Sequence, residues 1–497
     1  MELNIKFNYF KFPKLKLPKF SFTKFVSLFW LAMLAGCSSI PIMVPDMSMK
    51  PTHPVQLEGA NGTLSVKQSK AILTKLNKNG EDTNIFDKHL ALEAEIVGSP
   101  LVIGNNVELL VDGPTTYEAM FAAIDSAKDH INIETFIFED SEIGQRFANA
   151  LIAKQNSGVQ VNLIYDSVGS ITTAKAFFQT LKDAGINVLE FNPINPLKAR
   201  KGWQVNQRDH RKLLIVDGKI AFVGGINISS VYSSGSFSRR SERHSDDDDK
   251  DKASNKKDAS NKNAANTDIP WRDTHMRIAG PIVAEFQKLF MNTWASQKGD
   301  PLAAKNYFPE SGNQGKEIVR AIGSTPDEPY NQMYVTLLSA INSAETQIYL
   351  TNAYFVPDPQ MLTALKDAAG RGVDVRLLLP ERTDSALVFY ASRSYYDELL
   401  SAGVKIYERE DALLHAKTAM IDGVWSTIGS TNLDWRSFVN NQEINAVMLG
   451  RDFGAKMQAL FLKDLESSKL ITLETWRSRS LSARIKERAA RLWARFL

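Results

Sequence analysis

A set of polar residues that occurs twice with identical spacing is the feature that most constrains this chain. In each copy a histidine and a lysine stand two positions apart, followed by an Asp-Gly pair, a glycine and an asparagine. The two copies are His210, Lys212, Asp217, Gly224 and Asn227, and His415, Lys417, Asp422, Gly429 and Asn432. One copy could arise by chance, but a second copy with every spacing kept indicates an internal duplication.

Each copy predicts a buried β-hairpin. A histidine and a lysine two positions apart on an extended chain point to the same face. Residues 213–216 form an apolar run with β-branched members, which is typical of a strand buried on both sides. The Asp-Gly pairs are hairpin-turn dipeptides, and each is followed by a second apolar strand. Each copy offers one imidazole, one ammonium and one amide, and the two copies could close into one site.

Such a site suits a phosphodiester. One neutral imidazole can attack phosphorus, while the other, protonated, donates to the leaving alcohol. An ordinary histidine pKa of about 6.5 makes both forms accessible near neutrality. The two lysines and two asparagines would hold the non-bridging oxygens, so that no metal is required. Small residues would let the phosphate approach the backbone, and the predicted phosphate-binding residues are Asn227, Asn432, Gly225 and Ser430.

These residues resemble the paired HKD motifs of the phospholipase D superfamily, and within it the bacterial cardiolipin synthase-like members. The resemblance extends from about His89 to the C-terminus. It implies a covalent phosphohistidine intermediate, no metal and no other cofactor. The catalytic residues that it implies are His210, Lys212, Asp217, His415, Lys417 and Asp422. Both aspartates stand where a hairpin turn favours Asp, so a scaffold role is an equal alternative for them.

The resemblance also implies two acids that orient the imidazoles. Asp273 lies in a Trp-Arg-Asp-Thr-His segment after the first motif, and Glu443 lies in an Asn-Gln-Glu-Ile-Asn segment after the second. An N-cap or a surface ion pair is the alternative for Asp273. The sequence leaves open which acid serves which histidine.

Alternating strands and helices predict an α/β fold with a largely parallel sheet. The expected strands are 107–112, 131–138, 159–166 and 186–191, and the expected helices are 116–130, 143–155, 174–184 and 283–294. The repeat reaches beyond the motifs, since residues 123–127 match residues 340–344. We therefore expect two homologous α/β/α lobes with largely parallel or mixed sheets, related by pseudo-twofold symmetry, with the active site at their seam.

Composition along the chain predicts the domain boundaries. Residues 233–268 hold almost no apolar side chains and should be a disordered insert. Residues 475–497 predict a basic amphipathic helix, which either lies on an anionic membrane surface or packs against the body. The expected divisions are a signal peptide at 1–36, a tether at 37–86 with a helix near 66–76, a first lobe at 87–298, a linker at 299–332 and a second lobe at 333–474.

The N-terminus resembles a bacterial lipoprotein signal. Lysines precede a short apolar run at 25–34, and the segment Leu34 to Cys37 looks like a lipobox. Cys37 is the single cysteine of the chain, and the resemblance implies that it is acylated. Ser38 resembles an outer-membrane sorting signal, which predicts a protein facing the periplasm. A plain cleavable signal or an uncleaved anchor is the alternative.

The charge distribution argues against a nucleic-acid partner. Six lysines and one glutamate in residues 1–36 contribute +5 to a net charge of +3, which leaves the remainder near −2. The expected partners are a membrane surface and its phospholipids, phosphatidylglycerol and phosphatidylethanolamine, and a monomer suffices for the site. The resemblance favours cardiolipin synthesis. The alternatives are phospholipid hydrolysis, a periplasmic nuclease and a lipoprotein scaffold without catalysis.

Overall fold

A computed structural model of the chain describes residues 54–78, 85, 89–90, 93, 97–195, 203–204, 206–236 and 269–497. The predicted signal peptide, Cys37 and most of the predicted insert lie outside the described residues. At the start of that insert, Ser236 is buried and its backbone N–H donates to Asp112 Oδ2 at 2.7 Å. Among the described residues, no helix combines the length and apolar character needed to cross a membrane.

The first half of the chain folds into seven strands of a mixed sheet. Their order across the sheet is β6, β5, β4, β8, β9, β11, β3, and the neighbours among β4, β5 and β6 are parallel while the others are antiparallel. The strands are β3 (Leu101–Val111), β4 (His130–Thr135), β5 (Gln160–Asp166), β6 (Asn187–Phe191), β8 (Lys212–Val216), β9 (Ile220–Gly224) and β11 (Thr274–Ala279).

The second half repeats this topology. Its order is β15, β14, β13, β17, β18, β19, β12, with β13, β14 and β15 parallel, and β20 (Ser468–Ile471) extends the edge at β15. The strands are β12 (Glu317–Ser324), β13 (Gln347–Asn352), β14 (Asp374–Pro380), β15 (Lys405–Arg409), β17 (Lys417–Ile421), β18 (Trp425–Gly429) and β19 (Asn441–Leu449).

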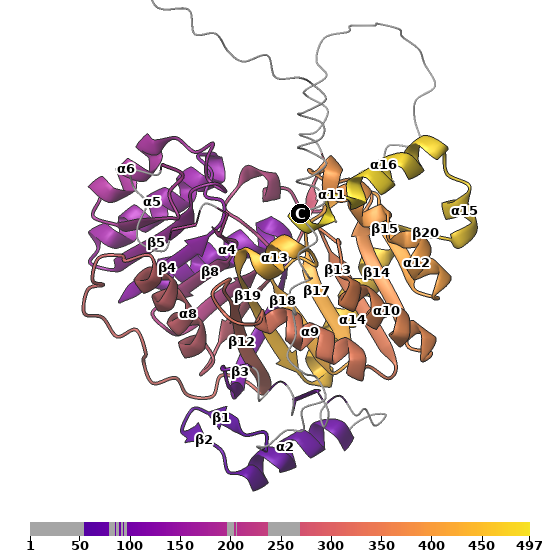
Figure 1. The fold of residues 1–497 in the computed structure, drawn as a ribbon. Helices are drawn as coiled ribbons and strands as arrows, with labels where there is room; N and C mark the ends of the chain where they lie inside the picture. Colours follow the sequence, from indigo (N-terminus) through magenta and orange to yellow (C-terminus); the bar gives the residue numbers. More distant parts are fainter. Residues whose placement is uncertain are drawn as a thin grey trace, which may run out of the picture. The chain divides into compact units, whose positions relative to one another are not determined.

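Strands β3 and β12 pair antiparallel and join both halves into one sheet (Figure 1). The predicted α/β class with two homologous lobes is confirmed. The pseudo-twofold axis that relates the lobes lies between these two strands. The sheet is mixed, which is one of the two strand arrangements that the sequence predicted. Hairpins at the motifs make the central strands antiparallel, and only the outer strands of each lobe follow helical crossovers.

Two of the predicted boundaries differ from the structure. The predicted linker at 299–332 contains β12, a fully buried strand that pairs with both β3 and β19. The predicted tether at 37–86 contains β1 (Leu57–Gly59) and β2 (Gly62–Thr63), and β1 pairs parallel with β3. The helix expected near 66–76 is present as α2 (Val66–Lys78).

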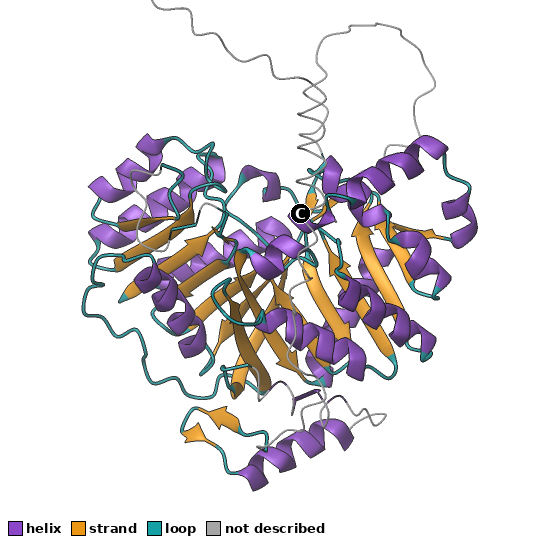
Figure 2. Ribbon diagram, viewed as in Figure 1, coloured by secondary structure: helices purple, strands orange, loops and turns teal. Residues whose placement is uncertain are grey.

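Helices cover both faces of the sheet (Figure 2). On the face shared by the lobes, α8 and α14 pack over a core to which Leu213 and Ile215 contribute. Leu214 and Val216 point to the opposite face, into the core of the first lobe. The motif strand is therefore buried on both sides, as predicted. The helices are α4 (Asp112–Ser126), α5 (Glu142–Asn156), α6 (Lys175–Asp183), α8 (Val283–Ser296), α9 (Gln332–Ser343), α10 (Pro359–Gly370), α11 (Ala386–Arg393), α12 (Tyr396–Ser401) and α14 (Arg451–Leu465).

The C-terminal tail is three short helices rather than the single predicted one. They are α15 (Leu473–Arg477), α16 (Leu481–Arg491) and the 3-10 helix η3 (Ala494–Phe496). The interruption falls at Ser480, whose hydroxyl caps α16 by accepting the N–H of Ala483 at 3.3 Å. Helix α16 packs against α11, which is the second of the two placements left open by the sequence.

The two Asp-Gly turns adopt the left-handed backbone that their sequence predicts. Asp217 and Gly218 have φ of 52° and 62°, and Asp422 and Gly423 have φ of 50° and 65°. The Asp217 carboxylate accepts the N–H groups of residues 128, 129 and 130 at 2.8–3.2 Å. The Asp422 carboxylate accepts those of residues 345, 346 and 347 in the same way. Each aspartate thus fastens its hairpin to the turn that precedes β4 or β13.

Replacement of Asp217 by alanine should destabilise the fold. Three backbone N–H groups lose a charged acceptor, so the free energy of unfolding should fall by about 2 kcal/mol. The change is measured as a shift of the urea midpoint. Asp125→Ala, which removes an exposed carboxylate from α4, is the matched control and should leave the midpoint unchanged. An unchanged midpoint in Asp217→Ala would contradict the scaffold role.

Candidate active site

The starts of the two motif strands are held at the seam between the lobes. Just before His210, β7 (Arg208–Asp209) pairs parallel with the start of β19, and the His210 N–H donates to Gln442 O at 2.9 Å. Just before His415, β16 (Leu413–Leu414) pairs parallel with β10 (Trp271–Arg272), and the His415 N–H donates to Arg272 O at 2.8 Å. The backbone of each motif histidine is therefore bonded to the opposite lobe.

The two imidazoles are oriented by acids that the lobes exchange. His210 Nδ1 lies 3.0 Å from Glu443 Oε2, and His415 Nδ1 lies 2.7 Å from Asp273 Oδ2. Glu443 belongs to β19 of the second lobe, whereas Asp273 lies between β10 and β11 of the first. The structure thus shows which acid lies beside which histidine, a question that the sequence left open. A carboxylate on Nδ1 places the hydrogen there and leaves Nε2 with its lone pair.

The motif lysines lie beside their own histidines. Lys212 Nζ donates to the carbonyl oxygen of His210, and Lys417 Nζ lies 2.9 Å and 3.0 Å from the two ring nitrogens of His415. Both lysines are 2% exposed, while His210 and His415 are 7% and 5% exposed. All four side chains are therefore buried, and the two histidines are slightly more exposed than the two lysines.

Burial and crowding of positive charge change the protonation of this cluster. Burial and, to a smaller extent, the two lysines lower the pKa of His210 to about 4, against the opposing effect of Glu443. The pKa of His415 is also lowered, first by burial and then by Lys417. Burial lowers the pKa of Lys212 to about 7 and that of Lys417 to about 8. Each lysine is close enough to the opposite histidine to affect its pKa, which joins the two motifs into one site.

The orienting carboxylates are held in their ionised form. Burial alone would raise the pKa of Glu443 and Asp273, but the adjacent imidazole and lysine outweigh it and lower both. Ser430 Oγ also donates to Glu443 Oε2. At neutral pH the site therefore holds neutral imidazoles fixed by charged acids, which is the state needed for attack on phosphorus.

The four predicted phosphate-binding residues have different surroundings. Asn227 Oδ1 accepts the N–H of Ile137 at 3.2 Å, and its Nδ2 donates to Tyr232 Oη at 3.3 Å. The backbone N–H of Asn432 donates to Ser437 Oγ at 3.3 Å, and its buried Oδ1 has no hydrogen-bond partner among the described residues. The unsatisfied atom of Asn432 is an acceptor oxygen, which cannot donate to a phosphate oxygen.

Gly225 and Ser430 lie behind the acids. A Cβ atom at Gly225 would stand 2.2 Å from Asp273 Oδ1, so only glycine fits there. At the equivalent position of the second lobe, the Ser430 hydroxyl bonds to Glu443. These contacts differ from the predicted phosphate contacts, because the space left by the small residues is occupied by a carboxylate.

Aromatic side chains that the motif pattern did not reveal surround His415. Tyr232 Oη lies 3.1 Å from His415 Nδ1, and the Trp271 and Tyr354 rings stand 5.2 Å and 6.2 Å from its ring. His210 has Phe136 at 5.0 Å instead. Tyr232 lies five residues after Asn227, and this spacing from the motif is the one signal that could have pointed to it. The two imidazoles thus occupy unequal environments.

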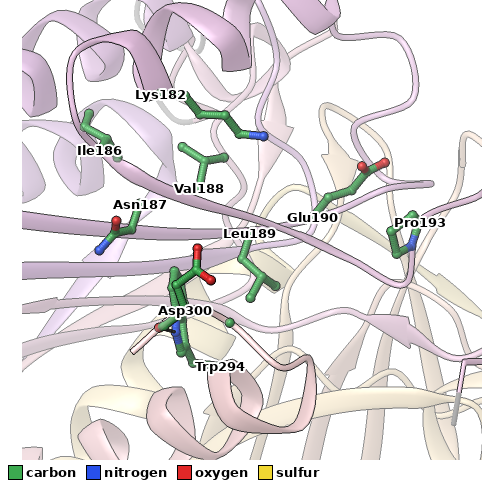
Figure 3. Close-up of a pocket in the computed structure, with 10 residues that line it drawn as sticks. Lys182, Ile186, Asn187, Val188, Leu189, Glu190, Pro193, Trp294 and Asp300 are labelled. Atoms are coloured by element: carbon green, nitrogen blue, oxygen red, sulfur yellow. Dashed lines mark hydrogen bonds between the residues drawn. The ribbon is translucent and has the colours of Figure 1, made fainter. Parts of the chain in front are cut away.

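A hollow of about 430 Å³ beside β6 lies apart from this cluster (Figure 3). Lys182, Glu190 and Asp300 stand at its walls, and none of the motif residues lines it. It belongs to the edge of the first lobe and contributes nothing to the histidine site.

The duplicated lobe, with its histidine and lysine on the central hairpin, defines a phospholipase D-like fold. A family model described as "Cardiolipin synthase, PLD-like domain" matches residues 120–242 and 337–465. The cardiolipin synthase of Geobacillus sp. (strain WCH70) is 37% identical over 406 residues, which cover 81% of this chain and 74% of that protein. The chain belongs to this cardiolipin synthase-like family of PLD-like domains.

Other relatives agree with this assignment. The cardiolipin synthase of Listeria monocytogenes serotype 4a (strain HCC23) is 36% identical over 400 residues, covering 80% of this chain and 76% of that protein. The crystal structure of phosphatidylserine synthase from Haemophilus influenzae Rd KW20 is 13% identical with a TM-score of 0.57, covering 82% of this chain and 99% of that one. That likeness supports the fold.

Loss of the lysine charges should shape the pH profile. An ammonium is protonated below its pKa, so raising the pH through about 7 for Lys212 and about 8 for Lys417 removes the positive charge that attracts a phosphate. We expect kcat/KM, which reports the free enzyme, to fall as pH rises between about 6 and 9. The fall in kcat should come at higher pH, because a bound anion favours the ammonium form. A kcat/KM that stays level up to about pH 10 would contradict this prediction.

Proposed function

We propose that the protein is a phosphatidyltransferase that acts through a phosphohistidine intermediate. The observation that carries this proposal is the crossed pairing of His210 with Glu443 and of His415 with Asp273 around two buried lysines. One imidazole attacks phosphorus through Nε2, and the bond to the leaving alcohol breaks. The other imidazole gives a proton to that alcohol, and later accepts one from the incoming hydroxyl.

The charge of the substrate completes the acid–base set. Below about pH 7, with both lysines and both carboxylates ionised and both imidazoles neutral, the cluster carries no net charge. A phosphodiester brings one negative charge into this buried cluster, which favours protonation of one imidazole. In the free site the lowered pKa values keep both imidazoles unprotonated. Substrate binding would protonate one of them, and that imidazole then acts as the general acid. Lys212, Lys417, Asn227 and Asn432 are proposed to hold the non-bridging oxygens.

We infer the substrate class from the relatives. Those cited above are named cardiolipin synthases, and the proposed reaction passes a phosphatidyl group from one phosphatidylglycerol to a hydroxyl of another, with release of glycerol. Phosphatidylethanolamine is a second candidate donor. The near-neutral charge outside residues 1–36 accords with a lipid rather than a nucleic-acid substrate.

The reaction can be tested with purified protein and radiolabelled phosphatidylglycerol, with and without phosphatidylethanolamine. We expect labelled cardiolipin and free glycerol. His210→Ala and His415→Ala should each lower turnover at least a thousandfold, by removing the nucleophile or the acid. His244→Ala, in the predicted insert, is the matched control and should keep full activity. EDTA should have no effect, because the lysines supply the positive charge.

The products distinguish the alternatives. Phosphatidic acid in place of cardiolipin would assign the activity to hydrolysis and contradict the proposed acceptor. Loss of turnover in EDTA would contradict the metal-free mechanism. Full activity in either histidine variant would refute the proposal that both histidines act in one active site.

We also propose that the protein is attached to a bacterial membrane by acylated Cys37 and faces the periplasm, with Ser38 favouring the outer membrane. This assignment rests on the lipobox-like segment and on the single cysteine. Membrane attachment would hold the enzyme beside its lipid substrates. We keep the proposed division into a first lobe at 87–298 and a second lobe at 333–474, with β12 added to the second.

Acylation of Cys37 is directly measurable. Cells given labelled palmitate should yield labelled protein, and Cys37→Ala should abolish the label because no other thiol exists in the chain. Ser38→Ala, one residue away, is the matched control and should keep it. Label that persists in Cys37→Ala would refute the anchor.

A further inference from the structure

The C-terminal helices turn their large apolar side chains away from the body. Leu481, Ile485, Leu492 and Phe496 are 70%, 58%, 79% and 74% exposed. They recur at helical spacing, whereas the opposite side of α16 is buried against α11 and includes Ala490. Packing against the body therefore uses one side of the helix and leaves a second, strongly apolar side in water.

This exposed surface lies on the same side of the molecule as the motif asparagine of the second lobe. The carbonyl oxygen of Leu497 accepts the N–H of Arg436 at 2.8 Å, which ties the tail to α13 (Trp435–Val439), just after Asn432. Figure 1 shows α11, α13 and α16 grouped beside the C-terminus. Neighbouring exposed residues enlarge the surface, and together they form the tail patch: Leu387, Val439, Leu481, Ile485, Leu492, Trp493 and Phe496.

A pocket of about 490 Å³ beside α16 is lined mainly by arginines. Three of them have carboxylate partners: Arg477 with Asp397, Arg491 with Glu398 and Arg479 with Glu487. No carboxylate of the described residues lies within ion-pair distance of the remaining two. The five arginines are Arg477, Arg479, Arg484, Arg488 and Arg491.

Arg484 and Arg488, which have no ion-pair partner in the described part of the chain, are both exposed. They stand on α16 beside the apolar stripe, one turn apart. With five cations against three carboxylates, the pocket carries a net charge of about +2 at neutral pH. It is therefore suited to a phosphate group, because guanidinium groups bind phosphate oxygens in a bidentate manner.

We propose that the tail patch docks on a lipid bilayer and that the arginine pocket holds the phosphate of an anionic phospholipid headgroup. An apolar helix face with arginines along its border matches the boundary between acyl chains and anionic headgroups. A second copy of this chain is a poorer occupant, because like patches would bring arginines against arginines. The inference concerns a site separate from the histidines and does not rest on the proposed reaction.

Docking can be tested with a spin label on Leu492→Cys in the full chain, in a Cys37→Ser background so that the introduced thiol is the only one. With vesicles of phosphatidylglycerol and phosphatidylethanolamine, the label should become accessible to oxygen and protected from a water-soluble nickel complex. With phosphatidylcholine alone it should stay in water. Leu462→Cys, on α14 and 41% exposed, is the matched control and should stay in water in both.

Substitution of the two exposed arginines provides a second test. In the labelled chain, Arg484→Gln with Arg488→Gln should lower the ratio of docked to undocked label about 25-fold, at about fivefold for each charge near an anionic surface. Lys219→Gln with Lys469→Gln removes two exposed charges from other elements and should leave that ratio unchanged. Equal circular dichroism of the variants would show that the fold is retained.

Four outcomes would overturn the proposal. Label 492 shielded without vesicles would mean that the patch is covered by the chain itself, and shielding that grows with protein concentration would indicate a second copy. Equal insertion into both kinds of vesicle would show that the anionic headgroup is not recognised. Binding of soluble glycerol phosphate without insertion of the label would assign the pocket to a free phosphate. Because none of these readouts requires turnover, a failure here is distinguishable from a failure of the proposed reaction.

Discussion

The exchange of acids between the lobes is the constraint on which the rest of the structure depends. A buried carboxylate needs a partner close by, and here the partner of each is an imidazole from the other lobe. Neither lobe holds a complete histidine–acid pair of its own. The same crossing occurs in the backbone, where each motif histidine donates its N–H to the residue that precedes the opposite acid. Separation of the lobes would therefore break both imidazole–carboxylate pairs at once.

The charges of the cluster explain why such burial is tolerated and what it permits. Below about pH 7, where both lysines are protonated, two ammonium groups balance two carboxylates, so the empty site avoids an uncompensated charge. That balance requires neutral imidazoles, and the lowered pKa of His210 and of His415 is consistent with it. In the proposed reaction, an entering phosphate anion would change this balance by one unit, and protonation of an imidazole would restore it. The proposal thus couples substrate binding to proton supply through electrostatics.

The sequence predicts short-range features well because they depend on neighbouring residues. The Asp-Gly turns, the doubly buried strand at 213–216 and most of the helices follow from local pattern alone. The pairing of Glu443 with His210 joins residues 233 positions apart, so no local pattern contains it. Gly225 and Ser430 give a second example. The sequence shows that both side chains are small, but it does not show that the space beside each is filled by a carboxylate from another part of the chain.

The misassigned strand β12 shows why the lobes act as one unit. It lies in a stretch with the Pro and Gly content of a linker, yet it pairs with β3 on one side and β19 on the other. Because β19 carries Glu443 and also pairs with β7 beside His210, the register of β12 against β19 influences where that acid meets its histidine. A core cluster that includes residues of both lobes lies over this junction. A flexible linker here would let the two histidines move apart, whereas a continuous sheet fixes their separation, as the proposed action of both on one phosphorus atom requires.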